Sequence, residues 1–382
     1  MTEPARVLLW AHRIASPATR TGLGRYVVGL TTALARAGEG AGLRYDIAAA
    51  PEPERPTWLP PGVGYCRLRR DRRLLHLGWT FTGRPRIEQL AGPVDVVHSL
   101  YPAFPVPTRA PLALTIHDLF VLEHPEWFER MERVGFRRAL DRAIGDGAQL
   151  IAVSAYTRDR LLAETETQPD QVEIVWSGID TDFHRPVSPE HRASTLTGFG
   201  LDQTPYVLAV GAINARKNLQ TAVAALARIE GPLRLVVAGP PGDAVPGLLA
   251  AADRLGMTDR VQLLGPVTDE ELVVLLDGAL LLAHPSLDEG FGFTPLEAMA
   301  AGTPVVVANS GSLPEVVADA AIVVGATDID AWAAAMADVA TDPELGVRLR
   351  EAGPSRAAQF RWEDTATRVT AIHARLRDQT SR

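Results

Sequence analysis

Two glutamates separated by seven residues, Glu289 and Glu297, frame the segment EGFGFTPLE, which contains a glycine-rich turn. Glu289 follows the apolar run ALLLA, so we expect it at the carboxyl end of a buried strand, the edge at which open parallel sheets bind ligands. Thr294 suits the N-cap of a helix, Pro295 its first position and Gly302 its end. These signals predict that Glu297 lies in the first turn of that helix.

This arrangement suits a ligand that carries both phosphate and many hydroxyls, such as a nucleotide sugar. Backbone N–H groups of the turn and of the helix start are suited to anionic or polar oxygens, and the carboxylates can accept hydrogen bonds from hydroxyls. For Glu297 there is a simpler alternative to ligand binding. Thr294 and Glu297 have the spacing of a capping box, in which Glu297 would serve only its own helix.

A second candidate site lies in the segment YVLAVGAINARKNL. An expected strand ends at Val210, Gly211 frees the backbone, and Arg216 with Lys217 stands at a helix start. Cations beside the positive end of a helix are locally unfavourable unless an anion joins them. A guanidinium fork and an ammonium together match a diphosphate. The alternative is a solvated basic pair at a helix edge.

The amino-terminal half offers weaker candidates. His117 follows the expected strand 112–116 and could contact a ligand at the strand's end, or it could be a histidine hydrogen-bonded to backbone. Gly22 and Gly24, in TGLGRY, are expected just before a helix, where backbone could approach a phosphate, or they could form a simple turn. The segment lacks the third glycine of the dinucleotide fingerprint. Ser154 is expected to be a helix N-cap without a chemical role.

Composition narrows the class of protein. The chain of 382 residues favours two domains. Cys66 is its only cysteine, which fits a reducing cytoplasm and provides no cysteine metal site. The histidines show no metal-ligand spacing. There is no signal peptide pattern, and no apolar run approaches the ~20 residues that span a bilayer. We therefore expect a cytoplasmic protein, with peripheral contact at the inner face of the membrane as an alternative.

Charge is unevenly distributed along the chain. Residues 1–180 carry 22 basic and 21 acidic residues, whereas residues 181–382 carry 16 and 25. An acidic carboxyl-terminal half argues against nucleic acid as a partner. One segment differs from the rest: CRLRRDRRLLHLGWTF, residues 66–81, mixes arginines with leucines and aromatic residues. It could contact an anionic membrane, or it could be a solvated face packed on one side.

Strand-length apolar runs alternate with helix-length amphipathic segments in two series. The expected strands are residues 7–11, 46–50, 94–98, 112–116, 150–153 and 172–176, then 206–210, 233–238, 261–264, 280–283, 305–308 and 322–324. Continuous apolar runs between helices predict parallel sheets covered on both faces. We therefore expect an α/β protein with two doubly wound, Rossmann-like domains facing a central cleft, residues 1–180 and 181–361. A last helix, 362–378, is expected to pack back on the first domain.

Several of these motifs together resemble the retaining GT-B glycosyltransferases of family 4. The resemblance is strongest in EGFGFTPLEAMAAGTPV from Glu289 and in the segment from Gly211 to Asn218. HDLFVLEHPEW from His117, VSAYT from Val153 and SGIDTDF from Ser177 add to it. The family's glycine loop often has adjacent glycines, whereas here Leu23 separates Gly22 from Gly24.

The resemblance implies transfer of a sugar from a nucleoside diphosphate sugar without a bound metal or other cofactor. Arg216 and Lys217 would hold the diphosphate, and Glu297 would accept hydrogen bonds from the ribose. Glu289 would lie by the sugar's hydroxyls. The remaining implied contacts are His117 close to the sugar, a glycine loop at Gly22 and Gly24, and a phosphate- and sugar-binding backbone at Gly211, Gly290, Phe291 and Gly292.

The pattern HDL…HPEW resembles the subgroup that transfers mannose from GDP-mannose, so these are the expected sugar and donor. The acceptor would be a glycan, a lipid-linked or a small-molecule hydroxyl. Two alternatives remain open, a GT-B nucleotide-sugar epimerase and a carbohydrate-binding subunit without activity. The sequence does not predict an oligomeric state.

Overall fold

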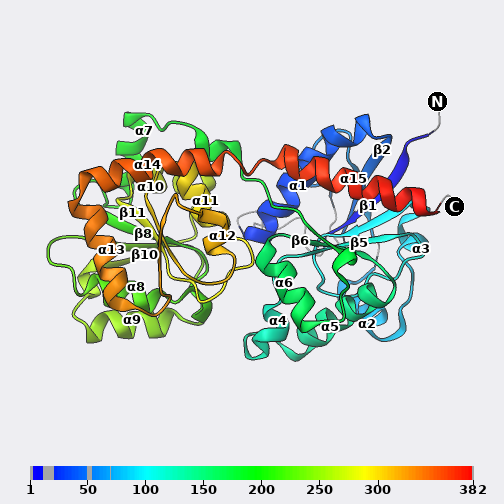
Figure 1. Ribbon diagram of the computed structural model, residues 1–382, viewed down its shortest axis with the longest axis horizontal. Coiled ribbons are helices and arrows are strands. Elements are labelled where there is room, and N and C mark those ends of the chain that lie inside the picture. The colour runs from blue at the N-terminus through cyan, green and yellow to red at the C-terminus, as the bar shows by residue number, and fades with distance from the viewer. Residues whose placement is uncertain (1–2, 12–20, 50–53, 69, 381–382) are drawn as a thin grey trace. The chain divides into compact units, whose positions relative to one another are not determined.

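A computed structural model describes residues 3–11, 21–49, 54–68 and 70–380 of the chain. The chain forms two compact units (Figure 1). The first unit comprises Met1–Gly178 together with Arg361–Arg382, and the second comprises Ile179–Phe360. The carboxyl-terminal helix therefore belongs to the unit that also contains the amino terminus.

The first unit is built on a seven-stranded sheet in the order β3-β2-β1-β4-β5-β6-β7, with every neighbouring pair parallel. Its strands are β1 Ala5–Trp10, β2 Leu43–Ala49, β3 Gly64–Arg67, β4 Val96–Ser99, β5 Leu112–Ile116, β6 Gln149–Ala152 and β7 Val172–Ile174. The central strands are almost wholly buried, as expected for a parallel sheet covered on both faces.

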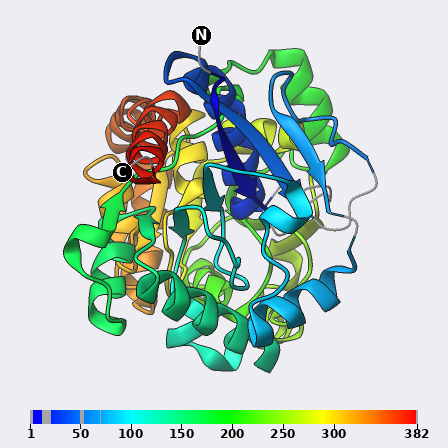
Figure 2. The same ribbon diagram turned by 90° about the vertical axis from the view of Figure 1, so that its right-hand side faces the viewer.

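Helices cover both faces of this first sheet (Figures 1 and 2). They are α1 Gly22–Gly40, α2 Arg72–Thr82, α3 Glu88–Ala91, α4 Phe120–Glu123, α5 Arg130–Gly145, α6 Ala155–Glu164 and α15 Trp362–Thr380. Helices α1 and α15 pack together on one face, and α2 packs with α5 on the other. Side chains alternate accordingly along β1, where Leu8 and Trp10 face the α2 side with Leu75 and Trp79.

A buried chain of hydrogen bonds attaches α15 to the first sheet. His373 on α15 bonds through Nε2 to Nδ1 of His98 on β4 at 3.0 Å, and through Nδ1 to the hydroxyl of Tyr45 at 3.2 Å. His98 bonds in turn to Thr115 on β5 at 2.8 Å, and Thr115 bonds to the hydroxyl of Tyr26 on α1 at 2.9 Å. These residues thus connect three strands and two helices within one unit.

The second unit contains a six-stranded parallel sheet in the order β10-β9-β8-β11-β12-β13. Its strands are β8 Tyr206–Val210, β9 Arg234–Ala238, β10 Val261–Gly265, β11 Leu281–His284, β12 Val305–Ala308 and β13 Ile322–Val324. Its helices are α7 Pro189–Gly198, α8 Leu219–Leu226, α9 Val245–Arg254, α10 Asp269–Gly278, α11 Phe293–Ala300, α12 Leu313–Val317, α13 Ile329–Thr341 and α14 Pro343–Ala357. Helix α8 packs against α9 and α13, and α11 packs against α14.

Each of the twelve strands expected from the sequence corresponds to a strand of the structure, and the bounds of four agree to the residue. Strand β3 was not expected, because Gly64–Arg67 is only partly buried and lacks a continuous apolar run. Within the described residues, no helix is both long and apolar enough to cross a membrane.

Candidate functional site

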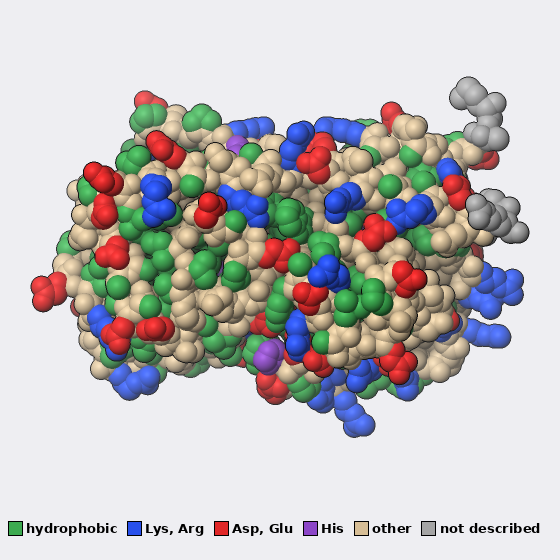
Figure 3. Space-filling view, in the orientation of Figure 1, with side chains coloured by type: hydrophobic (Ala, Val, Ile, Leu, Met, Phe, Trp, Pro, Cys, Tyr) green, Lys and Arg blue, Asp and Glu red, His purple; other side chains and the backbone are tan. Residues whose placement is uncertain are grey.

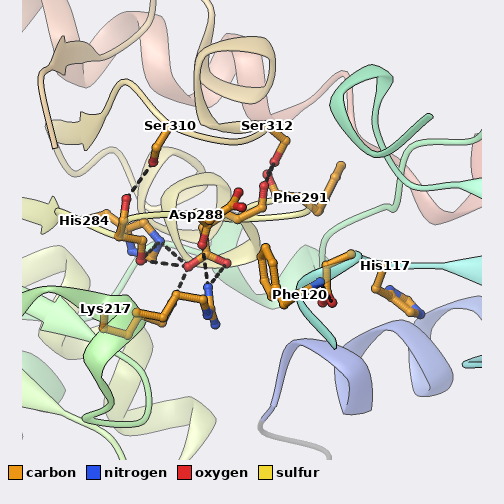
Figure 4. Close-up of polar contacts among 12 residues, drawn as sticks. His117, Phe120, Lys217, His284, Asp288, Phe291, Ser310 and Ser312 are labelled. Atoms are coloured by element: carbon orange, nitrogen blue, oxygen red, sulfur yellow. Dashed lines mark hydrogen bonds and ion pairs between the residues drawn. The ribbon is translucent and has the colours of Figure 1, made fainter. Parts of the chain in front are cut away.

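Glu289 lies at the carboxyl edge of the second sheet and is held by four side chains (Figure 4). Its Oε1 accepts hydrogen bonds from Lys217 Nζ at 2.7 Å and Ser286 Oγ at 2.8 Å, and it lies 3.1 Å from His284 Nε2. Its Oε2 lies 2.7 Å from Arg216 Nη1. One carboxylate therefore connects both predicted cations, which are 72 or more positions away along the chain.

The cluster is charged although it is nearly excluded from water. Burial by itself would raise the pKa of Glu289, but Arg216 and Lys217 outweigh it and hold that pKa well below the usual range. Burial lowers the pKa of Lys217, while the carboxylates of Glu289 and Glu297 act in the opposite direction. Glu289 is therefore ionised at neutral pH, and its charge is matched by the cations on either side.

His284 in this cluster is neutral at neutral pH. Burial, followed by the charge of Lys217, lowers the pKa of His284 to about 4. A carboxylate can only accept a hydrogen bond, so the neutral ring must carry its proton on Nε2 and donate it to Glu289. His284 thus orients Glu289 without adding charge.

The 3₁₀ turn η5 (Ala215–Lys217) presents the two cations between β8 and α8. Asn218 follows it in the left-handed conformation, and its side-chain amide donates to Pro285 O at 3.1 Å and to Ala326 O at 2.8 Å. Gly211 has φ 132°, and a Cβ built there would lie 3.0 Å from Cε of Lys217. Gly211 therefore leaves the space in which the lysine stem lies.

Ser312 fixes the glycine-rich turn that follows Glu289. This buried hydroxyl lies 2.9 Å from the carbonyl oxygen of Glu289 and 2.7 Å from that of Phe291, and it shares its single proton between them. The amide of Ser312 also donates to the Glu289 carbonyl at 2.8 Å. The ring of Phe291 is buried and packs edge-on against Phe293. Within the described part of the chain, the backbone amides of Phe291 and Gly292 donate to no other residue.

The start of α11 differs from the prediction. The helix begins at Phe293, and its N-cap is Gly292 with φ 112°, a conformation that glycine adopts without strain. Thr294 is the second residue of the helix and is not its N-cap, so the predicted cap and the capping box with Glu297 are wrong. Glu297 is the fifth helical residue, beyond the first turn, and is 2% exposed. Gly302, with φ 73°, follows the end of the helix as predicted.

In the first unit, His117 directly follows β5 and its ring contacts the edge of Tyr26 with centroids 4.5 Å apart. Its Nε2 lies 3.0 Å from the carbonyl oxygen of Leu100, to which it must donate, so the hydrogen bond to backbone considered above is present. Burial lowers the pKa of His117 to about 4. His117 is therefore neutral at neutral pH, and its Nδ1 has no hydrogen-bond partner among the residues that the structure describes.

Gly22 and Gly24 lie inside α1 and do not precede it, which corrects the prediction. Thr21 is the N-cap, and its hydroxyl accepts a hydrogen bond from the amide of Gly24 at 3.1 Å. The amide of Gly24 thus has a local partner, as in the simple turn considered above. Residues 12–20, which precede these glycines, lie outside the described residues.

The structure brings together Glu289, Arg216 and Lys217, with Gly211 beside the lysine. Gly290, Phe291, Gly292 and Glu297 follow on the turn and helix next to it. His117, Gly22 and Gly24 belong to the first unit. Ser154 caps α6 as predicted, accepting from the amide of Thr157.

Sequence reasoning missed three residues that hold Glu289: His284, Ser286 and Ser312. His284 ends β11 and Ser286 follows two residues later, so the strand-edge argument that identified Glu289 could also have identified both. Among the described residues, no group of three or more His, Cys, Asp and Glu side chains could hold a metal ion.

Two family descriptions match this chain. The family "Glycosyl transferases group 1" matches residues 199–356, and "Glycosyltransferase Family 4" matches residues 20–183. The first match contains the Glu289 cluster, and the second contains His117. Together they include most of both units.

Relatives of known activity include the O-antigen chain mannosyltransferase B of Escherichia coli, which is 30% identical over 70% of this chain and 71% of its own length. The D-inositol 3-phosphate glycosyltransferase of Mycobacterium avium is 32% identical over 71% of this chain. The chain matches 66% of that relative, and 63% of the corresponding protein of Mycolicibacterium paratuberculosis, thus less than two thirds of their length.

Solved structures with the same fold cover nearly the whole chain. Sucrose-phosphate synthase from Thermosynechococcus elongatus has a TM-score of 0.76 at 23% identity and covers 97% of this chain and 99% of its own. HepE from Anabaena, in complex with UDP and glucose, has a TM-score of 0.74 at 18% identity and covers 96% and 99%. The chain therefore belongs to glycosyltransferase family 4 and has the GT-B fold.

Proposed function

We propose that this protein transfers a hexose from a nucleoside diphosphate sugar to a hydroxyl acceptor, with retention of anomeric configuration and without a bound metal ion. The observation that carries the proposal is the buried cluster in which Arg216 and Lys217 flank Glu289 at the carboxyl edge of the second sheet. In open α/β sheets this edge is where ligands bind.

The cluster has the charges that a leaving diphosphate requires. Lys217 Nζ has three N–H donors, and Glu289 is its one partner among the described residues. Two donors of Lys217 are therefore able to bind phosphate oxygens, with the guanidinium of Arg216 next to them. Fixed cations aimed at a developing charge, in a site largely shielded from water, lower the barrier to its formation.

Glu289 can accept a further hydrogen bond, which we assign to the sugar. Among the described residues, its Oε1 has three partners, whereas Oε2 has Arg216 alone. A carboxylate oxygen can accept more than one hydrogen bond, so we assign Oε2 to a hydroxyl of the donor sugar. Glu297 is assigned to the ribose hydroxyls, and Nδ1 of neutral His117 to another sugar hydroxyl.

The proposed reaction needs no nucleophile from the protein. The bond between the anomeric carbon and the diphosphate oxygen breaks, the acceptor oxygen bonds to the same face of that carbon, and the acceptor's proton passes to the leaving phosphate. Glu289 is poorly suited to be a covalent nucleophile, because its charge is already bound by two cations and two hydrogen-bond donors. A trapped glycosyl ester on Glu289 would refute this step.

The donor that we propose is GDP-mannose. Support comes from the mannosyltransferase among the relatives and from the HDL…HPEW pattern. The acceptor is a glycan, lipid-linked or small-molecule hydroxyl. D-inositol 3-phosphate is a specific small candidate, because several relatives carry that name.

A donor and acceptor matrix tests the proposal. The full chain is incubated with GDP-mannose, UDP-glucose or UDP-galactose, each with D-inositol 3-phosphate, with a mannosylated glycan or with no acceptor, and with or without a chelator. We expect release of GDP that requires an acceptor and is unchanged by the chelator, and an axial product linkage by NMR.

Other outcomes of the matrix contradict particular parts of the proposal. Isomerised sugar from donor alone would indicate an epimerase. Binding of sugar without turnover on any pair would indicate a carbohydrate-binding subunit. Preference for a UDP sugar would overturn the donor assignment, and loss of activity with the chelator would overturn the metal-independent mechanism.

A further inference from the structure

The outward face of α2 in the first unit combines apolar side chains with arginines. Leu74, Leu77 and Phe81 are 70%, 44% and 56% exposed. They are spaced i, i+3 and i+7, so they lie within one narrow sector of a helix that turns 100° per residue. Isolated exposed leucines are common on protein surfaces, but an aligned stripe of three large apolar side chains marks an interaction surface.

The opposite side of the same helix is fixed to the core. Leu75 and Trp79 are buried, and Trp79 packs edge-on against Trp10 of β1 with ring centroids 5.0 Å apart. Trp79 also donates to Pro85 O at 2.7 Å, and Asp71 caps the helix by accepting from the amide of Leu74. The stripe Leu74, Leu77 and Phe81 is therefore held outward by a firmly seated helix.

Arginines surround this stripe. Residues 67–86 contain seven arginines and one acidic residue, Asp71, in a chain whose net charge is −8. Five of these arginines are exposed in the structure: Arg67, Arg70, Arg73, Arg84 and Arg86. The neighbouring helix α5 adds five arginines against two acidic residues. In Figure 3, arginine side chains, coloured blue, project from the lower edge of the unit that contains α2 and α5 in Figure 1.

One cation is in direct contact with the stripe. The guanidinium of Arg138 on α5 lies over the ring of Phe81, 4.6 Å from its centroid, and its Nη1 donates to Thr80 O at 3.1 Å. Apolar side chains and arginines are thus interleaved at one surface. This combination fits the boundary between acyl chains and negatively charged headgroups.

We propose that α2 docks the protein on an anionic lipid bilayer, with Leu74, Leu77 and Phe81 inserted between headgroups and with Arg70, Arg73, Arg84, Arg86 and Arg138 bound to lipid phosphates. The strong positive charge of this surface within an acidic protein argues for a lipid surface over an apolar protein partner. The proposal does not depend on the donor or the reaction proposed above.

Vesicle co-sedimentation of the full chain tests the surface. We expect binding to phosphatidylcholine vesicles that contain phosphatidylglycerol, little binding to phosphatidylcholine alone, and release near 1 M salt, where the Debye length is about 3 Å. Replacing Arg70, Arg73, Arg84 and Arg86 by glutamine should weaken binding about fivefold for each arginine. The triple change Leu74→Ser, Leu77→Ser, Phe81→Ser should weaken it at least about tenfold.

The second unit supplies a matched control. Leu249 and Leu255 are 47% and 44% exposed at α9, outside any arginine-rich segment, so Leu249→Ser with Leu255→Ser should leave vesicle binding unchanged. Thermal unfolding of every variant shows whether it is folded. Equal binding by wild type and the triple variant, or equal binding to neutral and anionic vesicles, would overturn the proposal. A triple variant that changes only self-association would indicate a second copy of the chain at this face.

A second readout reports insertion at a defined position. The chain has a single cysteine, Cys66, so Cys66→Ser allows an environment-sensitive fluorophore to be placed through Leu77→Cys or, as control, Leu249→Cys. Anionic vesicles should raise and blue-shift the emission at position 77 and not at 249. Equal responses at both positions, or no response at position 77, would contradict docking through α2.

Discussion

Each unit of this family 4 member contains a buried polar cluster, and the two clusters differ in charge. In the first unit, His98, His373, Thr115, Tyr26 and Tyr45 are joined by hydrogen bonds between neutral groups. Burial lowers the pKa of His373 to about 3 and raises that of Tyr45 to about 12, so neither carries charge at neutral pH. This cluster connects elements of the fold and needs no counter-ion.

In the second unit, a buried carboxylate faces two cations. Such a charged cluster is a poor way to stabilise a fold, because desolvation of the ions offsets most of their attraction. It is well suited to a site where charge appears during a reaction, since its dipoles and charges are already oriented. The neutral cluster therefore serves architecture, whereas the charged cluster around Glu289 has the properties of the ligand site proposed above.

Removal of the carboxylate tests this distinction most strongly. Glu289→Gln removes the carboxylate that both Arg216 and Lys217 contact, and we expect unfolding free energy to fall by about 3–5 kcal/mol. A nucleoside diphosphate should recover more stability in this variant than in the wild type, because it replaces the missing anion. Denaturant unfolding with and without GDP measures both effects. An unfolding free energy within about 1 kcal/mol of wild type would show that the cations do not depend on Glu289.

Loss of one cation should affect catalysis more than stability. Lys217→Ala removes a fixed charge next to the proposed diphosphate, and kcat should fall about 10²–10³-fold. The matched control is Arg228→Ala, which breaks the exposed ion pair with Asp330 in the same unit. Exposed pairs contribute about 0–1 kcal/mol, so turnover should be unchanged in the control. Near-normal turnover of Lys217→Ala would reject the assignment of this lysine.

The neutral histidines of the first unit, inside and outside the neutral cluster, predict a response to acid. Burial lowers the pKa values of His76 and His117 to about 4 and that of His373 to about 3, and burial with His373 lowers that of His98. An unfolded histidine titrates near 6.5. Below that pH the unfolded state therefore binds more protons, so stability is fully present above about 6.5 and falls toward pH 4, by about 1.4 kcal/mol per pH unit for each histidine.

The second unit should lose less stability over the same interval. Its histidines with lowered pKa are His284 and the more exposed His184, and Glu289 responds only to acid below the usual range of a carboxyl group. Hydrogen exchange of backbone amides at pH 7 and pH 5 can follow each unit separately. His373→Gln should flatten the response of the first unit, and exposed His191→Gln is the control. A larger acid response in the second unit would contradict the comparison.

The amino-acid sequence predicts more of the charged cluster than of the neutral cluster. Strands, the helix stop at Gly302 and the position of Arg216 and Lys217 follow from local apolar runs and turn residues, which act over a few positions. The contact between Lys217 and Glu289 joins residues 72 apart, and no local pattern specifies it. Thr294 has the right type for an N-cap, but Gly292 can adopt φ 112° and starts the helix earlier.

The neutral cluster was not predicted at all. His98 lies inside an expected strand and His373 inside an expected helix, where a polar side chain gives no sign of its partner. Their contact spans 275 positions and depends on the return of α15 to the first unit. Pairs so far apart in the chain can be identified only once the fold is known. The position of Arg216 and Lys217 next to a strand end, in contrast, suggests a ligand without knowledge of the fold.

Ser312 offers the smallest and most selective test of the charged cluster. Ser312→Ala removes a hydroxyl whose single proton is shared between the carbonyl oxygens of Glu289 and Phe291. Every ion pair remains, as does the hydrogen bond from the Ser312 amide to the Glu289 carbonyl. Because the buried carbonyl of Phe291 loses its hydroxyl donor, we expect a loss of about 1–3 kcal/mol in unfolding free energy. If the turn positions Glu289 for the sugar, kcat should fall while the thermal stabilisation by GDP is retained, since Arg216 and Lys217 are untouched. The control is Ser355→Ala, which changes an exposed serine. An equal loss of GDP binding and of kcat in Ser312→Ala would show that the turn holds the whole nucleotide sugar and not the carboxylate alone.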